Sequence, residues 1–216
     1  MQKGDFVKIN YIGRLESGEI FDLTDEEMAK KEKIHNPNVK YGPVTIIIGA
    51  GFIVPGIEKA MIEMNVNDKK KIDVKPEEGF GQRDPKLIRT IPKSAFRKQK
   101  LEPMPGMVVD FSGMKGRIQS ADGGRVRVDF NNPLAGKVLH YEVEIKEKIE
   151  DPKDKVQSIF DFFGVLGANV KIENNEATID SVKLPLELKN RISSLILEYA
   201  NMSKVHFIET FEKFRK

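Results

Sequence analysis

The sequence predicts an α+β protein: an antiparallel sheet wrapped on a short helix, an inserted mainly-β segment and a small C-terminal α/β region. Apolar and polar residues alternate over residues 6–12 and again over 139–149, which is typical of half-buried strands. A Gly-rich turn at 49–51 leads into Pro55 and a run of helical periodicity. A polar, Pro-containing break at 150–155 sets the last apolar segments apart from the rest.

The first elements are a hairpin, a small helix and a buried strand. The alternation that begins at Phe6 continues through the turn Glu16-Ser17-Gly18 into residues 19–22, which predicts two antiparallel strands. Thr24 and, three residues later, Glu27 have the spacing of a capping box, so we expect a short polar helix to begin there. The apolar run 44–48 then predicts a buried strand.

A second helix and a further strand follow the Gly-rich turn. Pro55 and Gly56 suit the first turn of a helix, where a fixed φ and a missing N–H cost little. Apolar residues then recur at helical spacing: Ile57, Ala60, Met61 and Met64. This pattern predicts a short helix with one apolar face. Residues 69–74 alternate and predict a strand whose Ile72 and Val74 point inward.

The stretch between Gly81 and Leu139 is too long for a simple loop and has structure of its own. Val126, Val128 and Phe130 alternate with charged residues, and Asp122-Gly123-Gly124 supplies a turn back to a preceding strand. We therefore expect an inserted domain over 85–132 that contains at least one hairpin. Alternation over 139–149 predicts a strand that returns to the first domain.

The C-terminal segment predicts a separate small α/β domain over 154–216. Strands around 170–172 and 177–179 meet at Asn174-Asn175, and a last segment lies near Val205 to Phe211. Between them an amphipathic helix carries Leu188, Ile192, Leu195, Ile196 and Tyr199 on one face.

Composition excludes several classes of function. The 36 Lys and Arg nearly balance the 33 Asp and Glu, so total charge predicts neither DNA nor membrane as a partner. With no Cys, disulfides and thiol nucleophiles are excluded. The apolar run 44–57 is too short and Gly-rich to span a bilayer, and we expect a cytoplasmic protein. His35, His140 and His206 lack metal-ligand spacing, so we expect no metal and no cofactor.

Five motif segments stand in a familiar order along the chain. They are Tyr11, Phe21-Asp22, the segment from Gly49 to Met61, Glu78-Gly79-Phe80-Gly81, and the run Asn132-Pro133-Leu134-Ala135-Gly136-Lys137. This order resembles FKBP-type peptidyl-prolyl isomerases, and more narrowly their SlyD-like, long archaeal branch. The resemblance covers roughly residues 1–150 and implies an FKBP-like isomerase domain over 1–84 and 133–152, interrupted by a chaperone domain.

The resemblance also implies which residues line a prolyl pocket. They are Tyr11, Phe21, Asp22, Val44, Ile46, Ile53, Val54, Ile57, Phe80 and Tyr141. Ile57 would form the floor, Phe21, Ile46 and Tyr141 the walls, and the Val54 N–H would bind a substrate carbonyl. Ile57 replaces the Trp of compact members, and Phe80 replaces a frequent Tyr.

In SlyD-like proteins the inserted domain binds unfolded chains. The residues expected to do so here are Phe96, Met107, Val109, Phe111, Met114, Val126, Val128 and Phe130, most of which also suit that domain's own core. Phe96, Met107 and Met114 are the predicted adaptable contacts. The expected partners are unfolded or partly folded polypeptides with X-Pro bonds, with weak ribosome association through scattered basic residues as a further option.

Two hypotheses from different classes remain open. The first is an isomerase that accelerates X-Pro isomerisation and has chaperone activity from its insertion. The second is a non-catalytic or weakly catalytic holdase on the same fold, because Ile57 and Phe80 alter the pocket. Monomer and dimer both remain compatible with the sequence, the dimer forming through the C-terminal domain.

Overall fold

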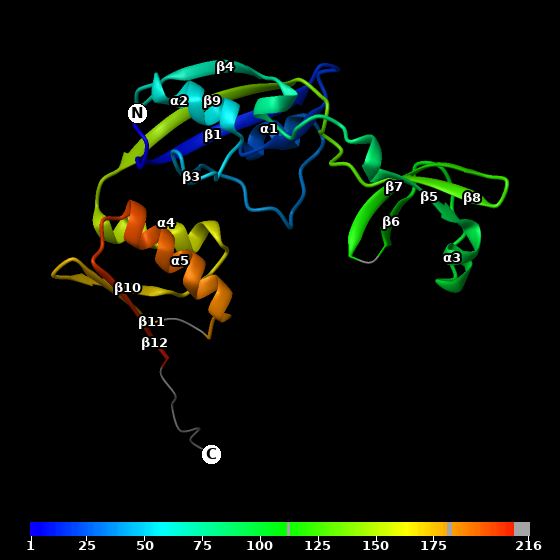
Figure 1. The fold of residues 1–216 in the computed structure, drawn as a ribbon. Coiled ribbons are helices and arrows are strands. Elements are labelled where there is room, and N and C mark those ends of the chain that lie inside the picture. The colour runs from blue at the N-terminus through cyan, green and yellow to red at the C-terminus, as the bar shows by residue number, and fades with distance from the viewer. Residues whose placement is uncertain (112, 181–182, 210–216) are drawn as a thin grey trace. The chain divides into compact units, whose positions relative to one another are not determined.

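The computed structural model describes residues 1–111, 113–180 and 183–209, and its internal contacts divide the chain into two compact units. The first unit joins Met1–Val74 to Leu139–Lys216, and the second is Lys75–Val138. Figure 1 follows the chain through both. The second unit is therefore inserted, in sequence, between two segments of the first.

An antiparallel sheet of five strands forms the centre of the first unit. Its strands are β1 (Phe6–Leu15), β2 (Ile20–Leu23), β3 (Val44–Ile47), β4 (Lys69–Val74) and β9 (Leu139–Ile149). The order is β2-β1-β9-β4, and β3 pairs with the first half of β1. The predicted hairpin, the strand at 69–74 and the returning strand at 139–149 are thus confirmed, and Ile72 and Val74 are buried as expected.

Two short helices accompany this sheet. Helix α2 (Pro55–Ile62) begins with Pro55 at its first position, buries Ile57 and Met61, and contacts β4. Helix α1 (Glu26–Lys31) exists as predicted, but its expected cap is wrong: Asp25, not Thr24, accepts the hydrogen bond from the N–H of Met28. Thr24 is one residue too early, and its hydroxyl bonds to β1 instead.

The C-terminal segment is a layer of two helices on a three-stranded sheet (Figure 1). The helices are α4 (Pro152–Phe162) and α5 (Leu186–Tyr199), and the strands are β10 (Asn169–Glu173), β11 (Glu176–Asp180) and β12 (Lys204–Ile208). The predicted turn at Asn174-Asn175 is present, with φ of 47° and 63°. Phe211, placed in the last predicted segment, lies outside the described residues.

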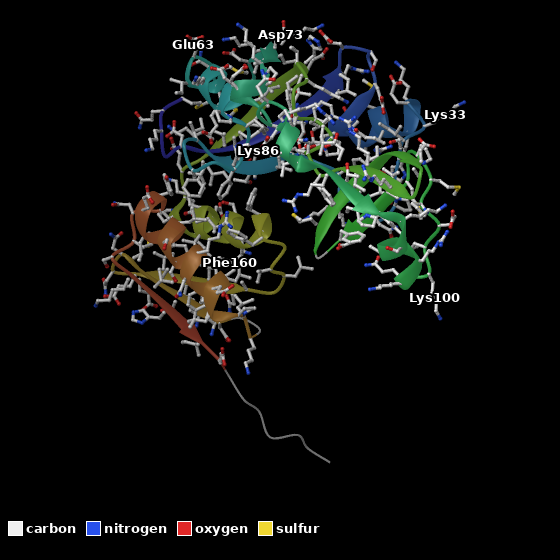
Figure 2. All side chains as sticks on the ribbon, turned by 45° about the vertical axis from the view of Figure 1, so that its right-hand side comes forward. Lys33, Glu63, Asp73, Lys86, Lys100 and Phe160 are labelled. Carbon is white, nitrogen blue, oxygen red and sulfur yellow. The ribbon has the colours of Figure 1, made fainter. Side chains whose placement is uncertain are left out.

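The core of this layer differs from the separate domain that the sequence predicts. Ile159 and Phe160 of α4 are fully buried in one cluster with Phe6 of β1 and Ile47 of β3. Figure 2 shows Phe160 inside the layer, whereas Glu63 and Asp73 point outward from the first unit. The polar break at 150–155 separates two sequence segments, but apolar packing joins them into one core.

The second unit is a four-stranded antiparallel sheet with a short helix. Its elements are two 3-10 turns (Pro76–Glu78 and Pro85–Leu87), β5 (Ile88–Pro92), α3 (Lys93–Lys98), β6 (Val108–Phe111), β7 (Met114–Asp122) and β8 (Arg125–Asp129). The strand order is β5-β8-β7-β6, and the β7–β8 hairpin turns at Gly123-Gly124 as predicted. A small core is built from Phe96, Val109, Ile118, Val126 and Val128.

Residues just before the expected insertion are bonded to residues near its end. The N–H of Asp84 donates to Asn131 Oδ1 at 2.8 Å, and Asn131 Nδ2 returns a bond to the Asp84 carbonyl. Arg83 forms an ion pair with the buried Asp129. These bonds tie the two chain ends of the unit together, and the unit, Lys75–Val138, extends beyond the expected insertion of 85–132 at both ends.

Within the described residues, no helix is both long and apolar enough to cross a membrane. Among the same residues, no group of three or more His, Cys, Asp or Glu side chains is placed to hold a metal ion.

Candidate functional site

A β-bulge at Phe21 interrupts the pairing of β1 with β2. Gly13 on β1 pairs with Asp22, and the next residue, Arg14, pairs with Ile20, so Phe21 is the extra residue. A bulge bends its strand and re-aims the side chains beside it. Phe21 and Asp22 therefore reach the same face of β1 as Tyr11.

Gly13 makes room for two aromatic rings on that face. A Cβ at Gly13 would lie 2.6 Å from Phe21 Cζ and 3.0 Å from Tyr141 Cε1, closer than non-bonded carbons approach. Phe21 and Tyr141 meet edge to face with centroids 5.5 Å apart, and Tyr11 lies 6.2 Å from Tyr141. The absence of a side chain at Gly13 thus lets an aromatic wall form against the strand.

The polar rim of this wall is a hydrogen-bonded pair. Tyr11 donates from its hydroxyl to Asp22 Oδ2 at 2.8 Å. Burial first, and then the negative charge of Asp22, raises the pKa of Tyr11 above its usual range and the pKa of Tyr141 to about 12. Both phenols are therefore neutral at physiological pH. Their rings form the wall, and the hydroxyl of Tyr11 donates a hydrogen bond to Asp22.

Thr24 fixes the backbone that carries Tyr11. Its buried hydroxyl accepts from the Tyr11 N–H at 3.0 Å, and its own N–H donates to the Tyr11 carbonyl at 3.0 Å. Asn10 Oδ1 accepts from the same hydroxyl at 3.1 Å. Sequence reasoning missed this role because the Thr24–Glu27 spacing predicts a helix cap.

The start of α2 presents backbone as well as side chains. Val54 is the extended residue before the helix, and its carbonyl accepts from the N–H groups of Ile57 and Glu58. Among the residues that the structure describes, none accepts a hydrogen bond from the Val54 N–H. Ile57 is fully buried one turn further on. Val54 thus offers a free donor above an apolar base.

A pocket of about 440 Å³ opens beside these residues. Four predicted site residues line it, namely Tyr11, Val44, Ile46 and Ile53. The loop before β3 adds Lys40, Tyr41, Gly42 and Pro43, and β1 adds Lys8. The Gly42 N–H donates to the Thr24 carbonyl, so the loop and the Tyr11 anchor are coupled.

Helix α4 supplies a wall that the sequence analysis did not assign to the site. Ser158, Asp161 and Phe162 line the same pocket. Phe162 stacks on Phe52, with centroids 3.9 Å apart and planes within 16°. A usable cue was present: Phe162 falls off the face of α4 that buries Val156, Ile159 and Phe160.

The ten predicted pocket residues thus divide into four groups. Tyr11, Val44, Ile46 and Ile53 line the pocket directly. Phe21, Asp22 and Tyr141 join it through Tyr11, while Val54 and Ile57 follow Ile53 in the chain without lining it. Phe80 belongs to the second unit and is 37% exposed.

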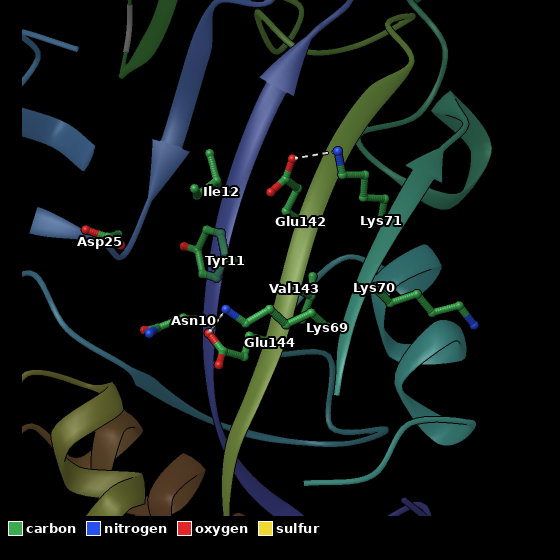
Figure 3. A pocket seen from close by; sticks show the side chains of 10 residues that line it. All are labelled: Asn10, Tyr11, Ile12, Asp25, Lys69, Lys70, Lys71, Glu142, Val143 and Glu144. Carbon is green, nitrogen blue, oxygen red and sulfur yellow. Dashed lines mark ion pairs between the residues drawn. The ribbon is translucent and has the colours of Figure 1, made fainter. Parts of the chain in front are cut away.

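A second hollow, of about 320 Å³, has a different character (Figure 3). Lys71 pairs with Glu142 at 3.3 Å and Lys69 with Glu144 at 3.5 Å, across β4 and β9. These residues alternate with Val143 along the strand and therefore face away from the aromatic wall. Solvated ion pairs of this kind contribute little stability and suit no apolar ligand.

The residues predicted to bind polypeptide in the second unit have two different environments. Phe96, Val109, Val126 and Val128 are buried and form the core, so they do not offer the direct contact that was expected of them. Met107, Phe111 and Phe130 are half-buried against that core, and Met114 is 39% exposed. Met104 and Val108, which the prediction omitted, are 61% and 57% exposed.

Comparisons with known proteins identify relatives of this chain. A family model described as "FKBP26, IF domain" matches residues 89–134. A short-type peptidyl-prolyl cis-trans isomerase of Methanocaldococcus jannaschii is 38% identical over 147 residues, which are 68% of this chain and 93% of that protein. A probable FKBP-type 16 kDa peptidyl-prolyl cis-trans isomerase of Pseudomonas fluorescens is 32% identical, with 64% and 85% of the two chains covered.

A third relative is the FKBP-type isomerase SlyD of Haemophilus influenzae, 31% identical over 67% of this chain and 70% of that protein. The match to the M. jannaschii protein spans nearly the whole length of that protein. The chain therefore belongs to the FKBP-type peptidyl-prolyl cis-trans isomerase family.

Proposed function

We propose that this protein is a peptidyl-prolyl cis-trans isomerase that acts without a covalent step. The observation that carries the proposal is the Tyr11–Phe21–Tyr141 aromatic wall beside a pocket of about 440 Å³. The wall offers apolar surface with a hydrogen-bonded rim, and no nucleophile is needed. Relatives named as isomerases support the same activity.

The chemistry needs only differential binding. An X-Pro bond isomerises over a barrier of roughly 18–20 kcal/mol, because amide resonance is lost as the bond twists. Water stabilises the planar, charge-separated amide, so an apolar pocket that removes water favours the twisted form. A thousandfold acceleration requires about 4 kcal/mol of such preference.

Each group of the site has a role in this proposal. Phe21 and Tyr141 would hold the proline ring, and Ile57 would support it from below. The free N–H of Val54 would bind a substrate carbonyl and fix the chain on one side of the twisting bond. Tyr11 and Asp22, locked together at 2.8 Å, would keep the rim rigid and polar.

We further propose that the second unit binds non-native polypeptide and supplies its X-Pro bonds to the pocket. Its exposed Met104, Val108 and Met114 are apolar, and methionine adapts to varied partners. The match of residues 89–134 to an IF-domain family model supports a distinct module here. Because the unit is covalently joined to the pocket, a captured chain would be held at raised effective concentration.

The first experiment is the isomerisation of a short X-Pro peptide by the intact protein and by Asp22→Ala and Tyr141→Ala. Acceleration by the intact protein and its loss in both variants are the expected results. Leu186→Ala is a matched control, because Leu186 is 72% exposed and lies on α5. Equal activity in all three variants and the intact protein would contradict the assigned pocket.

A second candidate, a holdase with little catalysis, is favoured by one observation. Ile57, at the expected pocket floor, has no exposed surface, so a proline ring reaches it only if neighbouring side chains move. No acceleration of any peptide, together with suppressed aggregation of an unfolded protein, would establish this candidate and overturn the first.

A further inference from the structure

Helix α4 of the C-terminal layer and the segment that precedes α2 together form one wall of the pocket. Phe162 on α4 and Phe52, next to Ile53, stack face to face at 3.9 Å. Phe163 meets Phe162 edge to face at 5.4 Å and packs against the buried cluster of the layer. The stack is therefore anchored in a core on both sides, although Phe162 itself is 43% exposed.

One pocket joins this wall to Tyr11 and Ile53, which border the proposed prolyl site. Tyr11 and Ile53 line one part, and Tyr41, Pro43 and Phe162 line another. Tyr41 is held in place, since its hydroxyl accepts from the N–H of Asn36 at 3.0 Å and its ring stacks on His35. This part of the pocket is therefore lined by rings that neighbouring contacts hold in place.

Three charged residues line the pocket: Lys8, Lys40 and Asp161. Lys8 is already paired with Glu147 at 2.8 Å. Asp161 accepts a bond from Gln157 at 3.3 Å, both on α4. The aromatic rings of the wall suit an apolar side chain rather than a phosphate or a strongly charged peptide.

We propose that this wall is a subsite for an apolar side chain of the substrate polypeptide, next to the proline in sequence, with Phe162 as its specificity-determining residue. The inference rests on the proposed isomerase function, because its occupant enters together with the proline. It is supported by one observation: Phe162, Tyr11 and Ile53 line the same pocket. The C-terminal layer then contributes directly to substrate choice.

The test uses the full chain and a set of peptides around one Ala-Pro bond. In each peptide a single Phe is placed at a different position on either side of the proline, and an all-Ala peptide is the reference. At one position we expect kcat/KM to exceed the reference by about fivefold to tenfold, the size of one aromatic contact. Phe162→Ala should abolish this preference, and Phe162→Leu should retain part of it.

Leu166→Ala is the matched control, because Leu166 is 77% exposed in the same layer and does not line the pocket. It should keep the full preference. An unchanged preference in Phe162→Ala would overturn the subsite, and so would an equal loss on the all-Ala peptide, which would indicate a general structural effect.

Calorimetric binding of the same peptides separates this inference from the proposed function. If the intact protein accelerates no peptide, the isomerase proposal fails, and the affinity ratio between the Phe and all-Ala peptides still tests the subsite. A ratio near one in the intact protein, or a ratio that Phe162→Ala leaves unchanged, would overturn it.

Discussion

The two compact units hold the apolar side chains assigned to substrate in different ways. In the first unit a bulge and Gly13 let Tyr11, Phe21 and Tyr141 contact one another, and Tyr11 lines the pocket. In the second unit five apolar residues form the core, while Met104 and Val108 remain more than half exposed. A fixed aromatic wall suits one chemical step, whereas a small core under exposed, flexible side chains suits many partners.

Removing most of the second unit should have the largest effect of all the changes proposed. We expect deletion of about residues 86–131 to leave turnover of a short X-Pro peptide intact and to lower the rate on a refolding protein by about a hundredfold, because effective concentration is lost. Both rates would be measured on the same preparations. Equal loss on peptide and protein would show that the two units do not divide the work.

Paired glycine substitutions test the two units in parallel, because each unit has a glycine against aromatic or branched side chains. A Cβ at Gly13 would meet Phe21 at 2.6 Å, and one at Gly116 would meet Phe130 and Val128 at 2.7 Å. Gly13→Ala and Gly116→Ala should each destabilise their own unit by about 1–3 kcal/mol.

Their effects on activity should differ. Gly13→Ala should reduce peptide turnover, since the rings of the wall must shift, while Gly116→Ala should reduce only the rate on a refolding protein. Thermal unfolding measures the stability change, and the short-peptide and refolding-protein assays measure the two rates. Gly18→Ala, whose Cβ meets nothing within 4 Å although its φ is +84°, tests backbone strain without a clash.

The regular elements around the site could be predicted from the sequence, because each is encoded by neighbours in the chain. Alternation along β1 and β9 and the Pro55 helix start are local patterns. The bulge at Phe21 is not a local pattern, because it is defined by the cross-strand pairing of Gly13 with Asp22 and of Arg14 with Ile20.

The far wall of the pocket could not be predicted for a related reason. Phe52 and Phe162 are distant in sequence, and their stacking depends on how the C-terminal layer packs on β3. The polar break at 150–155 favours independent domains, whereas the shared core of Phe6 and Phe160 joins them. Burial likewise decides which apolar residues of the second unit face solvent: Met104 does, and Phe96 does not.

Substituting the exposed methionines should weaken binding of unfolded polypeptide without affecting stability. Met104→Ser combined with Met114→Ser removes apolar surface that is 61% and 39% exposed, so we expect an affinity loss of about twofold to fivefold. Binding of a permanently unfolded protein, followed by fluorescence anisotropy, measures it. Leu166→Ser in the first unit removes similar surface and should have no effect; a matching loss there would make binding nonspecific.

The smallest expected effect is an alkaline one confined to the first unit, because all four tyrosines, at positions 11, 41, 141 and 199, lie outside 75–138. Burial, then Asp22, raises the pKa of Tyr141 to about 12, so the folded state keeps a proton that the unfolded state releases near pH 10. Stability of the first unit should therefore be complete below about pH 10 and decline as pH rises toward 12. Tyrosinate absorbance, compared between the intact protein and Tyr141→Phe, follows the ionisation, and a Tyr141 that titrates near pH 10 would show that the wall is open to water.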